Sequence, residues 1–295
     1  MHDQAQVLRG LMEHREDPSR PEPLAGWRSA QTIAITSGKG GVGKSNIALN
    51  LGIALARAGH SVCLLDANLG LGNLDLLCGL NGYWNLSHVI SGARTLSEVL
   101  LRGPAGLGVI PGASGLGELA DCSPLAQQEL RGQLAELEQA YEYLVIDTGT
   151  GIHRAVRHFV ALSDLGLVVT TPEPTAIADA YATIKALSAQ PDGPALEVLV
   201  NRADSAEQAR DIIARLQRTT RLFLHGEVGS AGFVPNDECV MQAVVRRTPF
   251  LVASPRQPAS LAIEQLARRV VNILHKQPAP DAFFTRLWPR LGLTG

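Results

Sequence analysis

Short apolar runs alternate with longer segments of helical periodicity along most of the chain. Runs rich in Val, Ile and Leu predict buried strands at 32–37, 62–66, 106–111, 143–147, 165–171, 195–200 and 232–235. Between them, segments such as 45–59 and 123–142 place apolar residues about one helical turn apart. Continuous apolar strands interleaved with helices are typical of a parallel sheet covered on both faces. The pattern predicts a single doubly wound, mostly parallel α/β domain with helices on both faces, over residues 27–276.

Two segments interrupt this alternation near the ends of the chain. Prolines and charges in EDPSRPEP (16–23) and KQPAPD (276–281) favour linkers. We therefore expect an N-terminal segment at 1–26 and a C-terminal tail at 277–295, on either side of the domain.

Composition narrows the classes of protein to consider. A net charge of −2 over 295 residues and a pI near 6.4 argue against attraction of the whole surface to nucleic acid. The four cysteines show no Cys-x-x-Cys spacing and are typical of a reduced, cytosolic protein. No stretch reaches ~18 consecutive apolar residues, so we expect a protein that is neither secreted nor membrane-spanning.

The glycine-rich stretch SGKGGVGKSN (37–46) carries the most specific chemical signal. Gly38, Gly43, Lys44 and Ser45 fit the phosphate-loop pattern G-x-x-x-x-G-K-[ST]. Lys44 is then expected to reach the β- and γ-phosphates, Ser45 to ligate Mg²⁺, and backbone N–H groups to surround the phosphates at a helix N-terminus. The predicted nucleotide-binding residues of the loop are Gly38, Lys39, Gly40, Gly41, Val42, Gly43, Lys44, Ser45 and Asn46.

The same loop also satisfies a second pattern. Gly38, Gly40 and Gly43 fit G-x-G-x-x-G, and Asp66 ends the next strand, where a dinucleotide-binding fold keeps its ribose-binding acid. Lys44 and Ser45 favour the phosphate loop because they are two further specific residues. A conventional enzyme, either a phosphate-loop ligase or an NAD(P)-dependent oxidoreductase, stays as the alternative.

The sequence K-G-G-V-G-K-S, with Lys39 as its first residue, resembles the deviant Walker A motif of the MinD/ParA ATPases. In that family the early lysine reaches across a nucleotide-sandwich dimer to the phosphates of the other subunit. The resemblance implies an ATP-dependent homodimer in which Lys39 and Lys44 are both catalytic, since each supplies positive charge where phosphoryl transfer collects negative charge.

The resemblance also implies a Mg²⁺ site. Asp147, which ends YLVID, resembles the Walker B carboxylate, and TGTGI (148–152) resembles the second switch loop. Asp66 is assigned to the Mg²⁺ side of the first switch. The implied metal residues are Ser45, Asp66 and Asp147, and the implied cofactors are ATP or ADP with Mg²⁺.

The adenine base is contacted in this family by the segments that follow two later strands. The corresponding residues here are Asn201, Arg202, Pro235 and Asp237. A turn-forming role for Pro235 and Asn236 is the alternative.

The first switch departs from the family pattern at one position. Relatives usually have Asp-x-Asp, whose second carboxylate polarises the attacking water, and here that position is Asn68. An amide can orient water, but it carries no negative charge and is a very poor proton acceptor at neutral pH. Loss of a general base costs on the order of 10²- to 10⁴-fold in rate, and phosphoryl transfer favours the low end because it depends more on positioning. We expect Asn68 to slow hydrolysis without preventing ATP binding.

Longer stretches resemble the FlhG/FleN branch of MinD-like ATPases, which limit flagellar number and placement. They include DANLGLGNLDLLCGL, EPTAIADAYATIKAL and PASLAIEQLARRV. The resemblance implies a regulator that cycles between a cytosolic monomer and a dimer on the cytoplasmic face of the inner membrane, including the cell pole. Flagellar C-ring components or a flagellar transcription activator are the implied partners. A ParA-type DNA-partitioning ATPase is the alternative, and only the arginines at 246, 247, 268 and 269 offer a basic face for DNA.

The first residues, HDQAQVLRGL, resemble the D-Q-A-x-x-L-R element of the same branch. In that branch the element forms a short helix that engages the GTPase FlhF and stimulates its hydrolysis. The implied partner-binding residues are Asp3, Gln4, Ala5, Leu8 and Arg9. An N-terminal helix packed on its own domain is the alternative.

The tail DAFFTRLWPRLGL (281–293) places Phe283, Phe284, Leu287 and Trp288 near one helical face. Aromatic residues beside arginines suit a membrane interface, and MinD relatives use a C-terminal amphipathic helix in this way. One short helix binds weakly, so a dimer that presents two of them would gain avidity. The alternative is that the tail docks on the ATPase domain in the monomer, and each arrangement can hold in one nucleotide state.

Overall fold

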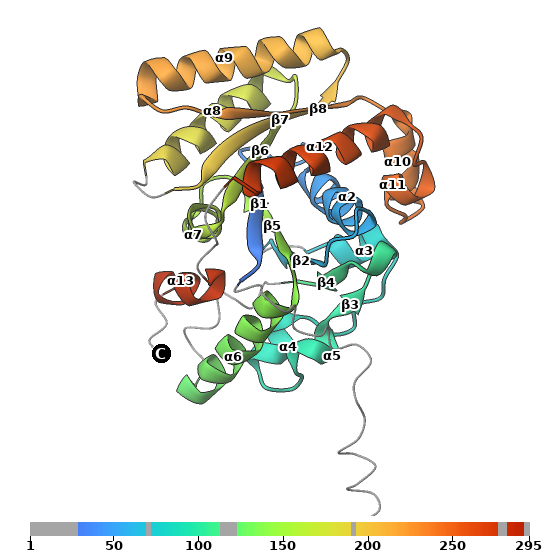
Figure 1. The fold of residues 1–295 in the computed structure, drawn as a ribbon, viewed down its shortest axis with the longest axis vertical. Helices are drawn as coiled ribbons and strands as arrows, with labels where there is room; N and C mark the ends of the chain where they lie inside the picture. The colour runs from blue at the N-terminus through green and yellow to red at the C-terminus, as the bar shows by residue number, and fades with distance from the viewer. Residues whose placement is uncertain (1–28, 69–71, 113–122, 190–192, 277–281, 292–295) are drawn as a thin grey trace, which may run out of the picture.

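The computed structural model describes residues 29–68, 72–112, 123–189, 193–276 and 282–291. These residues form one eight-stranded sheet in the order β3-β4-β2-β5-β1-β6-β7-β8 (Figure 1). Every neighbouring pair is parallel except β3 with β4. The strands are β1 (Gln31–Ser37), β2 (Val62–Ala67), β3 (Leu101–Arg102), β4 (Gly108–Ile110), β5 (Tyr143–Thr150), β6 (Leu165–Thr170), β7 (Ala195–Ala203) and β8 (Gly229–Pro235). The predicted doubly wound, mostly parallel α/β fold is confirmed.

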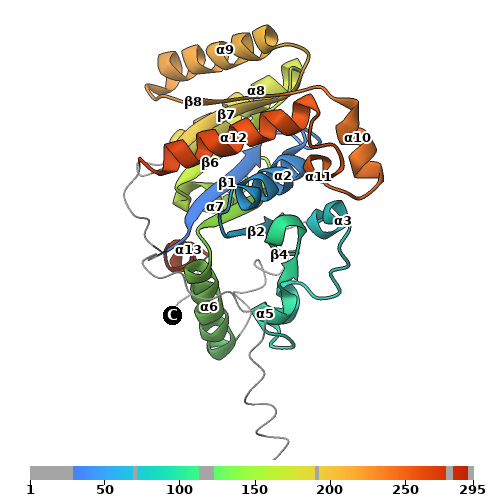
Figure 2. The ribbon, with the colours of Figure 1, turned by 45° about the vertical axis from the view of Figure 1, so that its right-hand side comes forward.

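Helices connect the strands and cover both faces of the sheet. In chain order they are α2 (Lys44–Arg57), α3 (Leu74–Cys78), α4 (Leu86–Ile90), α5 (Leu96–Val99), the 3₁₀ turn η1 (Pro104–Gly106), α6 (Pro124–Ala140), α7 (Arg154–Leu162), α8 (Pro174–Ser188), α9 (Ala206–Leu224), α10 (Glu238–Val245), α11 (Phe250–Ala253), α12 (Pro258–Leu274) and α13 (Phe283–Arg290). Figure 2 shows α2 and α12 lying together over one face of the sheet.

Successive side chains of a central strand enter different cores, because strand side chains alternate between faces. In β2, Leu64 belongs to the core beneath α2 and α12, whereas Cys63 and Leu65 belong to the core beneath α6 and α13. A third core joins β6 and β7 to α8 and α9. Both faces of the sheet are therefore buried, which explains why the strands are continuous apolar runs.

The strand register brings the predicted site residues to one edge of the sheet. Asp66 of β2 lies opposite Asp147 of the neighbouring β5, and Asp147 lies opposite Ile35 of β1. The loop 38–43 follows directly after β1 and leads into α2. The glycine loop and both carboxylates thus meet at the carboxyl ends of the strands, where open α/β sheets bind their ligands.

The C-terminal helix α13 packs against α6 and α7 (Figure 1). Phe283, Phe284, Leu287 and Trp288 are each at most 2% exposed. In this structure the tail adopts the docked arrangement that the sequence left open, and membrane binding by these four residues stays a prediction. No helix among the described residues is long and apolar enough to cross a bilayer.

Several short elements escaped the sequence patterns. Strand β8 begins at Gly229 and not at residue 232, and the strand expected at 106–111 is the shorter β4. The two-residue β3 and the helices α3 to α5, of four or five residues each, were not predicted. Elements this short contain no more than one or two turns of pattern, so periodicity does not detect them.

Candidate nucleotide-binding site

At two positions of the loop only glycine fits, because other elements approach the backbone closely. A Cβ on Gly38 would lie 2.3 Å from the carbonyl oxygen of Asp179 in α8. Gly43 has φ 93°, and a Cβ there would lie 2.3 Å from Nδ2 of Asn201 in β7. The Asn201 amide also donates to the carbonyl of Val42 at 2.8 Å. The loop is therefore held in shape from α8 and β7, which sequence spacing alone did not reveal.

Lys44 begins α2 and connects the loop to the sheet. Its Nζ lies 2.6 Å from Oδ1 of Asp147, and both side chains are at most 5% exposed. The first turn of α2 has no side-chain cap and no acidic residue. An uncapped helix N-terminus beside a buried lysine suits phosphate groups, and phosphate binding by these residues stays the prediction of the motif.

Asp66 and Asp147 place two buried carboxylates beside that single lysine. Burial, followed by the negative charge of Asp147, raises the pKa of Asp66 to about 6, while N–H groups of Asn68 and Leu74 and the charge of Lys44 oppose the rise. Two carboxylates against one cation leave negative charge that a divalent ion can neutralise.

The oxygen donors at this site suit Mg²⁺, which is usually held partly by the nucleotide and water, better than a metal that is held by protein side chains alone. Within the described residues, no group of three or more His, Cys, Asp and Glu side chains is arranged to hold a metal. Mg²⁺ commonly takes one or two carboxylates together with substrate phosphates and water. Ser45, the second residue of α2, supplies the hydroxyl that the motif assigns to this ion.

Asn68, in the first switch, lies close to the second switch segment. Its backbone N–H donates to Oδ1 of Asp66 at 3.1 Å, and its side-chain oxygen would lie 3.7 Å from a Cβ built on Gly149 in the second switch. The structure thus places Asn68 next to the Asp66 carboxylate and the second switch. Its catalytic role stays a prediction.

Lys39 is engaged within its own chain. Its Nζ lies 2.6 Å from Oε2 of Glu173 and 3.1 Å from Oγ1 of Thr175, at the start of α8. The hydrogen bond and charge of Lys39 hold the pKa of Glu173 below its usual range. Sequence reasoning missed Glu173, although it follows β6 at the same edge of the sheet and precedes Pro174 at the first position of a helix.

Of the four predicted adenine residues, Asn201 and Arg202 lie on β7, Pro235 ends β8, and Asp237 lies just before α10. Asn201 braces the loop, and Arg202 is exposed with φ 58°. The Asp237 carboxylate accepts N–H bonds from Cys239 and Ala259 and so joins α10 to α12. These bonds hold its pKa below the usual range although partial burial opposes ionisation. The register aligns Pro235 with Ala203. Adenine contact by these residues stays a prediction, since their observed contacts are structural.

A buried glutamate holds the docked tail. Glu138 of α6 is 2% exposed, and it accepts N–H bonds from Phe283 at 2.5 Å and Phe284 at 3.3 Å. The Ser29 hydroxyl donates to the same carboxylate at 2.5 Å. Phe283 also stacks on Phe159 of α7, with ring centroids 6.3 Å apart. The Glu138 carboxylate therefore satisfies the N-terminal N–H groups of α13, as a capping residue does.

The predicted partner-binding residues at the N-terminus, Asp3, Gln4, Ala5, Leu8 and Arg9, lie outside the described residues. Their role in engaging FlhF stays a prediction.

Comparison with known proteins agrees with this geometry. A family model described as the CobQ/CobB/MinD/ParA nucleotide binding domain matches residues 33–250, which include the glycine loop and both carboxylates. The chain belongs to the MinD/ParA family of ATPases. The chain is 41% identical over 247 residues to the antiactivator FleN of Pseudomonas aeruginosa, covering 84% of this chain and 88% of that protein.

A second MinD-like relative matches over nearly the entire length. The flagellum site-determining protein YlxH of Helicobacter pylori is 33% identical, covering 99% of this chain and 100% of that protein. Among solved structures, the MinD of the MinC:MinD complex from Aquifex aeolicus has 28% identity and a TM-score of 0.66, covering 82% of this chain and 96% of that one. The resemblance to the FlhG/FleN branch, inferred from the motifs, is confirmed, and so is the prediction of an ATPase.

Proposed function

We propose that this MinD-like ATPase is a nucleotide-switched regulator of flagellar number and placement, alternating between a cytosolic monomer and a membrane-associated, ATP-bound dimer. The assignment to flagella is supported by the names of two relatives, the antiactivator FleN and the flagellum site-determining protein YlxH. The observation that carries the switch is the pairing of a complete phosphate site with a tail helix docked on the same domain.

ATP binding is assigned to the glycine loop. Its backbone N–H groups and the N-terminus of α2 would contact the phosphates, with Lys44 exchanging its contact to Asp147 for one to the nucleotide. Ser45, Asp66 and Asp147 would hold Mg²⁺, which when bound supplies positive charge against the phosphate oxygens. Asn201, Arg202, Pro235 and Asp237 would lie near the adenine.

Dimerisation is assigned to Lys39. Its side chain is 38% exposed and its partner Glu173 is 57% exposed, so a second subunit can reach the lysine without disturbing a core. Exposed ion pairs contribute little to stability. Exchange of Glu173 for the phosphates of the other subunit is therefore energetically accessible, and Lys39 would then supply charge in trans.

Membrane association is assigned to α13. The side chains of Phe283, Phe284, Leu287 and Trp288 are shielded from water by α6 and α7 in the monomer, and an acyl-chain environment would shield them equally well. Because both environments are apolar, a modest change in the domain can shift the tail from one to the other. Two released tails in one dimer bind more strongly than one.

Hydrolysis returns the protein to the monomer in this scheme, and Asn68 slows that step. The dimer is therefore long-lived. Residues 1–26 engage the GTPase FlhF through Asp3, Gln4, Ala5, Leu8 and Arg9, and other surfaces serve C-ring components or a flagellar transcription activator. The protein works at the cytoplasmic face of the inner membrane, including the cell pole.

Co-sedimentation separates this proposal from its competitors. The full chain is mixed with phospholipid vesicles or with duplex DNA, each in Mg-ATP and in Mg-ADP. We expect vesicle binding that is stronger in ATP, and no DNA binding. Binding to DNA without binding to vesicles would favour a partitioning ATPase of the ParA type and contradict the proposal.

The partner assignment has its own test. The full chain is expected to stimulate GTP hydrolysis by FlhF, and Gln4→Ala to reduce that stimulation while its own ATP binding is unchanged. Equal stimulation by both proteins would contradict the assignment of the N-terminal segment.

A further inference from the structure

The exposed side of α12 carries a concentration of positive charge near its C-terminal end. Arg268, Arg269 and Lys276 are exposed and line a hollow of about 780 Å³. Glu197 of β7 and Ser230 of β8 form the other side of this hollow. The chain as a whole carries a net charge of −2, so this concentration is local and not a consequence of composition.

In the lining of this hollow, one acid, Glu197, faces three cations. Burial raises the pKa of Glu197, and the charge of Arg269 partly offsets the rise. Arg269 is also fixed in place, because its Nη1 donates to the carbonyl of Ser230. The side chains of Arg268 and Lys276 are exposed, so their charges face solvent.

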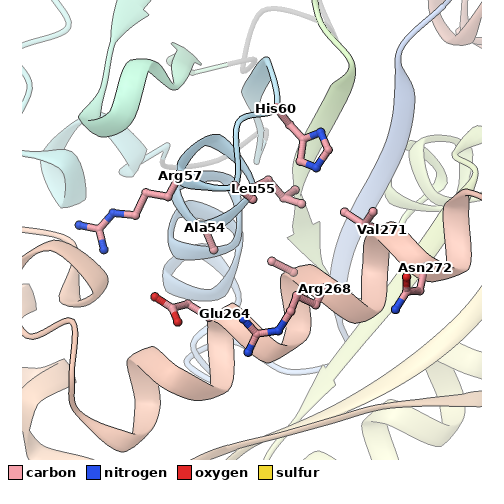
Figure 3. A pocket seen from close by; sticks show the side chains of 10 residues that line it. Ala54, Leu55, Arg57, His60, Glu264, Arg268, Val271 and Asn272 are labelled. Carbon is pink, nitrogen blue, oxygen red and sulfur yellow. The ribbon is translucent and has the colours of Figure 1, made fainter.

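A second hollow, of about 420 Å³, lies on the other side of α12. Figure 3 shows Arg268 and Asn272 of α12 across from Arg57 of α2 and His60 of the following turn. Arg57 donates to the carbonyl of Leu251 at 3.1 Å and is held there. Glu264 is the acid of this hollow. Arg268 lines both hollows, so the positive surface continues around the helix; we call Arg57, Arg268, Arg269 and Lys276 the α12 basic face.

The α12 basic face lies close in the chain to the start of the tail helix α13. Lys276 is the last described residue before the segment 277–281, and α13 begins at Phe283. A chain spans at most ~3.3–3.6 Å per residue, so six steps from Lys276 to Ala282 reach roughly 20 Å. If α13 enters a membrane, Lys276 must remain within that distance of it. The position of Lys276 is therefore fixed close to the lipid headgroups.

We propose that the α12 basic face binds the headgroups of anionic phospholipids when α13 is released. The inference rests on the proposed membrane association and adds to it a second contact, of a different chemistry, on the folded domain. Each Lys or Arg near an anionic leaflet strengthens binding about fivefold at moderate ionic strength. Arg268 and Lys276 together should contribute roughly twentyfold, which compensates for the weak hold of one short helix.

Vesicle binding by a variant that lacks two of these positive charges tests the proposal. The full chain and the double variant Arg268→Gln, Lys276→Gln are titrated in Mg-ATP with vesicles of phosphatidylcholine alone or with 30% phosphatidylglycerol. The matched control, Arg210→Gln with Arg218→Gln, removes two exposed cations from α9. ATP affinity and thermal unfolding are measured for all three proteins to verify that the domain is intact.

We expect the α12 variant to lose about twentyfold in affinity for the anionic vesicles and to bind neutral vesicles as the wild type does. The control variant should behave as the wild type on both. The difference should shrink as salt is raised, since exposed charges are screened beyond ~10 Å at 0.1 M. Equal loss by the two variants, or no loss by the α12 variant, overturns the inference and leaves the proposed function intact. Failure of the wild type to bind any vesicle overturns the proposed membrane association itself.

Discussion

Nζ of Lys39 lies 2.6 Å from Oε2 of Glu173, within one chain. In the MinD/ParA family this lysine is expected to act on the other subunit. Here it is instead held by a glutamate of its own domain. The pair joins the glycine loop to the N-cap residue of α8. Under the proposed function, Glu173 competes with the nucleotide phosphates for this lysine.

Removing the competitor should favour the dimer. Glu173→Gln is expected to lower the ATP concentration needed for half-maximal dimerisation, by no more than a few-fold because solvent already screens the exposed pair. Light scattering during an ATP titration measures it. Glu207→Gln, an exposed acid in the first turn of α9, is the matched control. A higher ATP requirement in Glu173→Gln would show that this glutamate supports the dimer.

Restoring the missing carboxylate should accelerate turnover. Asn68→Asp is expected to raise the rate of ATP hydrolysis on the order of 10²-fold, the low end of the usual contribution of a general base. The steady-state release of phosphate measures it. The substitution adds an acid beside Asp66, whose carboxylate accepts the backbone N–H of residue 68 at 3.1 Å, so ATP affinity must be measured in parallel. Equal rates in wild type and Asn68→Asp would show that residue 68 does not limit turnover.

The docked tail should depend on the Glu138 acceptor. Glu138→Ala leaves buried donors at Phe283, Phe284 and Ser29 without an acceptor, which costs about 1–3 kcal/mol. We expect the docking equilibrium of α13 to weaken by roughly 10- to 100-fold. Fluorescence of the buried Trp288 follows the release. Glu129→Gln, at an exposed position of α6, should leave the signal unchanged, and an unchanged signal in Glu138→Ala would refute the assignment.

Docking should also depend on pH. Burial raises the pKa of Glu138 in the docked state, while hydrogen bonds from Ser29, Phe283 and Phe284 and the charge of Arg286 oppose the rise. A raised pKa means that the docked state binds a proton more tightly than the released state. Docking is therefore strongest below the usual pKa of a glutamate and weakens as pH rises through the raised value.

A substitution identifies the titrating group. Glu138→Gln keeps a carbonyl acceptor for the N–H groups and cannot titrate. In this variant we expect α13 to dock equally well at all pH values. Arg286 of α13 forms a second polar contact with the domain, since its Nη2 lies 4.0 Å from Oδ1 of Asp164. A pH dependence that persists in Glu138→Gln would show that Glu138 is not the titrating group.

Local patterns predicted which segments meet at the carboxyl edge of the sheet. The glycine loop, Asp66 and Asp147 are each recognisable from a short stretch, because a buried strand followed by glycines or an acid specifies where the chain turns. Parallel strands then bring such ends to one edge, as the alignment of Asp66 with Asp147 shows. The fold followed from the same property, since both faces of the central strands are apolar.

Contacts between distant segments were not predictable in this way. Glu138 lies 145 residues from Phe283 in the chain, and no pattern near either residue announces their hydrogen bond. The Lys39 contact with Glu173 spans 134 residues, and the fit of Asn201 against Gly43 depends on the packing of β7 beside β1 through β6. The tail could be assigned an apolar face from its sequence, but not the surface that covers it.

Nucleotide-dependent self-association tests the central claim most directly. Sedimentation velocity of the full chain, at one protein concentration, is compared in Mg-ATP and in Mg-ADP. The account predicts a monomer in ADP and a dimer in ATP, with Lys39→Ala remaining monomeric in both. A sedimentation coefficient that is the same in ATP and ADP for the wild type would contradict it.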